Sequence, residues 1–127
     1  MNLIDLVALL ALLQLTLFSM LVGRARMQHH VRAPAVSGNE AFERAYRVQM
    51  NTIEQLVVFL PALYIAARYW PQPWAAALGA VYLVGRLVYR QAYLADPDKR
   101  GPGFMLTALP TLLLLLGGLV GVLRGAA

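Results

Sequence analysis

The chain has 127 residues, of which 60% are hydrophobic and only 13% are charged. Soluble globular domains are about 45–50% apolar, so this composition argues against an ordinary soluble domain. Cysteine is absent, which excludes disulfide bonds, thiolate metal sites and a cysteine nucleophile. The length allows one domain, residues 1–127.

The apolar residues are gathered in blocks long enough for a bilayer, which takes roughly 20 mainly apolar residues to cross. These blocks predict an all-α integral membrane protein, a four-helix bundle in up-down-up-down order. The predicted helices cover residues 3–23, 38–69, 74–95 and 104–123. We expect no soluble domain beside them, and no removable signal peptide, because the first block is too long and lacks a preceding basic region.

The formal net charge of +5 follows a topological pattern. Of the eleven Lys and Arg residues, all but Arg68 and Arg124 flank the first or the third connection between predicted helices. The positive-inside rule then places these connections in the cytoplasm and both termini on the opposite side. The basic balance is therefore explained without nucleic acid as a partner.

Local signals set the expected helix ends. Ser37 and Glu40 form a predicted capping box at the start of the second helix, and Pro61 lies inside that helix. The stretch from Trp70 to Trp74 predicts a tight outer turn with an aromatic belt. Gln14 is interpreted as a helix–helix hydrogen bond rather than a ligand contact, and no metal site is expected.

Two polar sets share helical spacing at the cytoplasmic ends of their helices. Arg47, Asn51 and Glu54 are spaced i, i+4, i+7, which places them on one face. On the third helix, Arg86, either Tyr89 or Arg90, and Tyr93 repeat the spacing. Guanidinium, carboxylate, carboxamide and phenol groups at one depth suit a zwitterionic, peptide-like ligand. The alternative is structural: arginines snorkel, and Arg–Glu pairs hold helices together.

The two motifs FERAYRVQMNTIEQ and YLVGRLVYRQAYLADPDKR resemble the MAPEG family, the membrane-associated proteins of eicosanoid and glutathione metabolism. The resemblance covers nearly the whole chain, with both motifs in order. It implies a homotrimer with membrane lipids around it, and glutathione as cosubstrate between neighbouring subunits near the cytoplasmic side. It implies glutathione contacts at Arg26, Arg47, Gln49, Asn51, Glu54, Arg86, Tyr89 and Tyr93.

The resemblance also implies that an arginine after the third helix activates the glutathione thiol. Ungapped counting from Arg86 assigns this catalytic role to Arg100, with Lys99 as the alternative cation. A thiol titrates near ~8.5, and a neighbouring cation lowers that pKa. The thiolate would then attack a lipophilic electrophile, a reaction suited to detoxification.

Two positions depart from the family's leukotriene-synthesising branch. Gln55 replaces a tyrosine that contacts glutathione there, and Met27 replaces a second arginine assigned to the epoxide oxygen. These departures argue against leukotriene synthesis itself. The expected function is a membrane glutathione transferase with an additional glutathione peroxidase activity.

Two other functions stay open from the sequence. One is a non-catalytic MAPEG-like membrane protein that binds glutathione or lipid. The other is a small multidrug transporter, which would need a membrane-embedded carboxylate in the first helix. That helix has only Asp5, at its edge.

Overall fold

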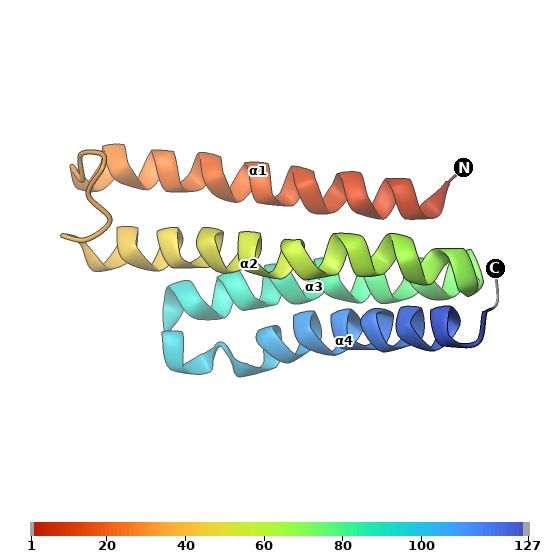
Figure 1. Cartoon of the computed structure of the whole chain (residues 1–127). Coiled ribbons are helices and arrows are strands. Elements are labelled where there is room, and N and C mark those ends of the chain that lie inside the picture. The colour runs from red at the N-terminus through yellow and green to blue at the C-terminus, as the bar shows by residue number, and fades with distance from the viewer. Residues whose placement is uncertain (1, 126–127) are drawn as a thin grey trace.

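The computed structural model describes residues 2–125 as a bundle of four long helices (Figure 1). The helices lie side by side, and the chain reverses direction at each connection. A short 3-10 helix, η1, precedes the last of them. The bounds are α1 Leu3–His29, α2 Glu40–Tyr69, α3 Gln72–Ala95, η1 Pro97–Lys99 and α4 Gly101–Leu123. The predicted all-α fold with four helices is confirmed over this part of the chain.

The α1–α2 and α3–α4 connections lie at the same end of the bundle (Figure 1). We call it the basic end, because it carries the arginines that flank these connections. Three helical segments are long and apolar enough to cross a membrane: α1, α2 and residues Pro97–Leu123. The sequence predicted a fourth span in α3, but α3 is not among the helices that are long and apolar enough to cross a membrane. Its second half contains Arg86, Arg90 and Gln91.

α1 is longer than predicted, because it continues through the basic stretch to His29. Arginine, methionine and glutamine are good helix formers, so nothing in this stretch ends the helix. The end comes at His30, which adopts the left-handed conformation at φ 56° and donates its backbone N–H to Arg26. α1 therefore carries Arg26 on a helix rather than on a loop.

The predicted capping box of α2 is wrong by register. Asn39, not Ser37, caps the helix, and its side chain accepts a hydrogen bond from Phe42 N at 2.9 Å. Glu43 reaches back to accept from Gly38 N at 3.2 Å. Gly38 has φ 122°, a conformation that glycine adopts readily and that keeps the helix from starting earlier.

Three further sequence interpretations are confirmed. α2 ends at Tyr69 and α3 begins at Gln72, which makes the predicted tight turn. Gln14 donates from Nε2 to Leu83 O at 3.0 Å, joining α1 to α3. Pro61 lies inside α2 without ending it.

α3 and α4 approach each other closely at two glycines, and this contact holds the polar half of α3 against the start of α4. A Cβ on Gly85 would lie 2.7 Å from the carbonyl carbon of Leu106. A Cβ on Gly103 would collide with the backbone of Tyr89. Both added Cβ atoms would be far closer to their neighbours than van der Waals contact allows, so the two helices could not pack this way with larger residues at these positions.

Gly85→Ala is therefore expected to destabilise the bundle by about 1–3 kcal/mol, the usual cost of overpacking. Thermal unfolding of the detergent-purified protein measures the effect. Gly23→Ala is the matched control, because nothing lies within 4 Å of its added Cβ and alanine favours a helix interior. Equal stability of the Gly85 variant and the parent protein would contradict this packing.

Candidate functional site

The polar face of α2 forms as its spacing predicted. Arg47 Nη2 donates to Glu54 Oε1 at 3.1 Å, and Asn51 Nδ2 donates to the same oxygen at 3.4 Å. The Arg47 and Glu54 side chains are 48% and 52% exposed. An exposed ion pair contributes only about 0.2–1 kcal/mol, so a ligand with stronger charge-assisted hydrogen bonds can replace it. Asn51 is buried, and its Oδ1 has no hydrogen-bond partner among the described residues.

Arg86 lies in the interior of the bundle, where its side chain is fully buried. Its Nη2 donates to Thr52 Oγ1 at 2.9 Å, and its Nη1 donates to Thr107 Oγ1 at 3.4 Å. The guanidinium also lies 4.4 Å from the ring centroid of Tyr89. Arg86 thus ties α3 to both α2 and α4.

The two threonines are oriented for this task by their own helices. Thr52 donates its hydroxyl proton to Val48 O at 2.7 Å, and Thr107 donates to Gly103 O at 3.1 Å. Because a hydroxyl has one proton, the oxygen lone pairs are left to face Arg86. Neither threonine was predicted from the sequence as a site residue. The available signal was a threonine directly after Asn51 and another within the apolar fourth block.

Arg86 has no acidic partner among residues 2–125. Its Nε is also buried without a hydrogen-bond partner there. A buried charge is costly unless it is paired or well hydrogen-bonded, and hydroxyl oxygens are neutral acceptors. The uncompensated positive charge of Arg86 therefore favours the binding of an anion near Tyr89.

Replacing either threonine tests this support for Arg86. We expect Thr52→Val to lower the free energy of unfolding by about 1–3 kcal/mol, because it leaves a buried guanidinium N–H without an acceptor. Chemical denaturation in detergent, followed by circular dichroism, gives the value. Thr111→Val is the control: Thr111 is also buried and donates to Thr107 O, but it does not bond to Arg86. Equal losses in both variants would contradict a special role for Thr52.

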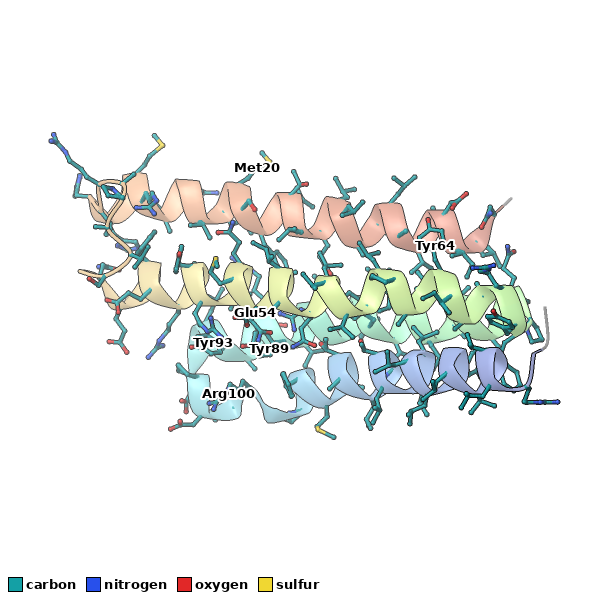
Figure 2. All side chains as sticks on the ribbon, in the orientation of Figure 1. Met20, Glu54, Tyr64, Tyr89, Tyr93 and Arg100 are labelled. Atoms are coloured by element: carbon teal, nitrogen blue, oxygen red, sulfur yellow. The ribbon has the colours of Figure 1, made fainter. Side chains whose placement is uncertain are left out.

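The α2 and α3 sets each contribute one residue to the lining of an open pocket of about 380 Å³ near the basic end. Arg47 lines it from α2 and Tyr93 from α3, so we call it the Arg47–Tyr93 pocket. The ring centroid of Tyr93 lies 5.6 Å from that of Tyr89, and Tyr89 is only 3% exposed. The expectation that both polar sets share one membrane depth stays a prediction. Figure 2 shows Glu54, Tyr89 and Tyr93 in the same half of the bundle.

Arg100 lies beside this pocket and not in it. Its guanidinium donates to Pro97 O at 2.8 Å, and Pro97 lines the Arg47–Tyr93 pocket. Arg100 itself is exposed and lines a separate hollow with Asp98, Gly101 and Phe104. The alternative cation, Lys99, ends η1 and is also exposed. Figure 2 shows Arg100 at the basic end, near the start of α4.

The side chains of Arg26 and Gln49 make their hydrogen bonds away from the Arg47–Tyr93 pocket. Arg26 Nη1 donates to Ala35 O at 2.7 Å, and its guanidinium lies 4.7 Å from the ring centroid of Phe42. Gln49 Nε2 donates to Ser19 Oγ at 3.0 Å, toward α1. Of the predicted site residues, the lining of this pocket includes Arg47 and Tyr93. Arg47 and Asn51 both bond to Glu54, whereas the hydrogen bonds of Arg26, Gln49 and Arg100 go to other parts of the chain.

A known protein family matches this chain over almost the whole four-helix bundle. A model of the MAPEG family matches residues 4–120, from the start of α1 into the last turn of α4. The chain belongs to the MAPEG family. The matched residues of this MAPEG protein include all of α2 and α3, the helices that supply Arg47 and Tyr93 to the pocket.

Several proteins are similar to this MAPEG protein over most of their length. Human microsomal glutathione S-transferase 2 is 40% identical over 114 residues, 89% of this chain and 78% of that protein. Guinea pig (Cavia porcellus) leukotriene C4 synthase is 38% identical over 117 residues, 92% of this chain and 78% of that protein. An uncharacterized protein of Synechocystis is 48% identical over 102 residues, 80% of this chain and 74% of that protein.

Metal ligation receives no support from the geometry of this MAPEG protein. Within residues 2–125, no group of three histidine, aspartate or glutamate side chains lies close enough together to hold a metal ion. The site's chemistry is carried instead by guanidinium, carboxylate, amide and phenol groups.

Proposed function

We propose that this MAPEG protein is a membrane glutathione transferase that joins the glutathione thiolate to lipophilic electrophiles. One observation carries the proposal: in a chain 40% identical to a microsomal glutathione S-transferase, Arg47 of the hydrogen-bonded Arg47–Asn51–Glu54 face lines a pocket with Tyr93 at the basic end. The reaction of glutathione with hydroperoxides is proposed as a second activity of the same site.

The site's groups match the parts of glutathione one by one. Arg47 pairs with a carboxylate of glutathione through charge-assisted hydrogen bonds. The ammonium group of glutathione then replaces Arg47 as the partner of Glu54. Asn51 offers its unpartnered Oδ1 to a peptide N–H. Arg86 supplies positive charge from the interior, and Tyr89 and Tyr93 donate phenol hydrogen bonds.

A homotrimer completes the site in this proposal. Arg26 and Gln49 face away from the Arg47–Tyr93 pocket of their own chain. Placed on a neighbouring subunit, they reach glutathione from the other side. The exposed apolar residues along α1 and α4 provide surfaces for subunits or lipid, among them Leu9, Leu13, Leu109 and Leu119.

The chemical step needs a thiolate near Arg100. The guanidinium stabilises the negative sulfur and so lowers the pKa of the thiol below its usual value near ~8.5. The sulfur then forms a bond to the electrophilic carbon, the leaving group departs with the bond electrons, and the thiol proton goes to water. With a hydroperoxide, two glutathione molecules are oxidised to the disulfide while the peroxide is reduced to an alcohol and water.

The basic end faces the cytoplasm in this proposal. It holds the arginines that the positive-inside rule assigns to that side. Both ends of the chain then lie across the membrane, at the end of the bundle where Asp5 accepts a hydrogen bond from Tyr64 at 2.8 Å. Lipophilic acceptors enter from the bilayer, and glutathione enters from the water.

The direct test is conjugation of 1-chloro-2,4-dinitrobenzene by detergent-purified protein, followed by absorbance of the thioether. Glutathione-dependent product above the uncatalysed rate supports the transferase. Glutathione binding without turnover, with both this halide and cumene hydroperoxide, would replace it with the non-catalytic binding protein. Proton-coupled export from sealed vesicles, without conjugation, would favour the transporter.

A further inference from the structure

An open groove of about 790 Å³ runs between α1 and α3, on a different part of the surface from the Arg47–Tyr93 pocket. Most of its lining is apolar, and two polar side chains, Arg90 and Gln91, stand toward the basic end. No acidic residue lines it. Its lining includes Leu17, Phe18 and Leu21 of α1 and Arg90, Gln91 and Leu94 of α3.

Arg90 is the unusual member of this groove. It is half-buried, and its guanidinium lies 5.5 Å from the ring centroid of Phe18. Among residues 2–125 it makes no ion pair and donates no side-chain hydrogen bond, unlike Arg47 and Arg86. A guanidinium has five N–H donors, and a partly desolvated cation without an acceptor is costly.

The groove is separate from the proposed glutathione site. Successive residues of an α-helix are about 100° apart, so Tyr89 faces the interior while Arg90 faces α1. Snorkelling would carry the Arg90 guanidinium along the helix to water, but the contact with Phe18 holds it against the groove wall. The groove thus presents a partly buried cation beside an apolar channel.

We propose that this groove binds one anionic membrane phospholipid, with its phosphate on Arg90 and an acyl chain along the leucines below. Arginine pairs with phosphate through two parallel hydrogen bonds, and Gln91 adds an amide donor. Basic pockets between membrane helices at the cytoplasmic side are suited to lipid head groups. The groove is continuous with the bilayer-facing surface, because Leu17 and Leu87 are 48% and 56% exposed.

Charge and shape decide between this occupant and glutathione. A zwitterionic peptide would leave its ammonium group without a carboxylate here, since no acidic residue lines the groove. It would also cover apolar side chains with peptide groups that find no partners. A phospholipid satisfies the cation and the apolar channel together.

Native mass spectrometry of the detergent-purified protein tests the proposal. The protein is mixed with equal amounts of phosphatidylglycerol and phosphatidylcholine of the same acyl composition. We expect retention of phosphatidylglycerol over phosphatidylcholine, and Arg90→Leu to reduce that preference about tenfold, the value of one lost charge-assisted hydrogen bond. Inorganic phosphate should not displace the lipid, because it lacks acyl chains.

Arg124→Leu is the matched control. Arg124 is an exposed arginine at the other end of the bundle, with its guanidinium 6.0 Å from the ring centroid of Trp70, and it should leave the preference unchanged. Arg90→Gln repeats the test with a smaller loss of side-chain volume, and helical circular dichroism checks both folds. The proposal is overturned if Arg90→Leu and Arg90→Gln retain the parent preference, or if the parent protein shows none.

Discussion

Arg100→Ala is expected to lower the conjugation rate near pH 7 by about tenfold or more, and to lose much less near pH 9. Without the guanidinium, the bound thiol returns toward its ordinary pKa near ~8.5, so most of it is protonated at neutral pH. At alkaline pH the thiolate forms unaided. Initial rates with 1-chloro-2,4-dinitrobenzene across this pH range measure the shift of the rising limb.

Two variants locate the effect. Lys99→Ala produces the same shift only if the neighbouring cation is the activator, since both residues are exposed beside the pocket. Arg124→Ala, at the far end of the bundle, controls for the loss of one positive charge. Full activity of Arg100→Ala at neutral pH, with an unshifted profile, would remove Arg100 from the catalytic role.

Arg47→Ala is expected to weaken glutathione binding by about ten- to a hundredfold. A hydrogen bond to a charged group contributes about 1.5–3 kcal/mol, and each 1.4 kcal/mol is a tenfold change in Kd. The substitution also leaves Glu54 without its 3.1 Å partner, so a ligand carboxylate meets an unpaired negative charge. Isothermal titration calorimetry of detergent-solubilised protein measures the Kd.

Arg68→Ala is the control on the same helix. Arg68 is exposed near the opposite end of α2 and makes no ion pair among residues 2–125, so its loss should leave the Kd unchanged. An Arg47 variant that binds glutathione as tightly as the parent protein would show that the α2 face is structural.

The sequence was sufficient for features that depend on one helix at a time. Helical periodicity alone predicts that Arg47, Asn51 and Glu54 share a face, and their hydrogen bonds confirm it. The apolar blocks likewise predict four helices. Helix ends were less certain, because the Ser37–Glu40 pattern placed the cap two residues early and the choice of Asn39 depends on the backbone of Gly38.

Features that depend on how helices are rotated against each other were not predictable. Periodicity places Arg86 on a face of α3 but does not say which neighbours that face meets. The burial of Arg86 between Thr52 and Thr107 follows from the close α3–α4 contact at Gly85 and Gly103. Arg90, which its spacing left as an alternative to Tyr89, lies instead against α1, with its guanidinium 5.5 Å from the ring centroid of Phe18.

The separation of Arg26, Gln49 and Arg100 from the pocket has a physical meaning for the proposed function. Arg26 and Arg100 satisfy nearby backbone carbonyls, and Gln49 bonds to Ser19. Arg26 makes two such hydrogen bonds and the others one each, with a net value of about 0.5–1.5 kcal/mol per bond. A neighbouring subunit with bound glutathione can exchange them for stronger charged contacts.

The proposed glutathione site is tested most directly by the thermal stability of the parent protein with and without glutathione. Ligand at 100 times its Kd should add ~2.7 kcal/mol to the folded state and raise the Tm. Glutathione diethyl ester, which has both carboxylates blocked and so cannot pair with Arg47, should give little shift at the same concentration. The absence of any shift at millimolar glutathione, or an equal shift with the ester, would contradict recognition of glutathione by Arg47.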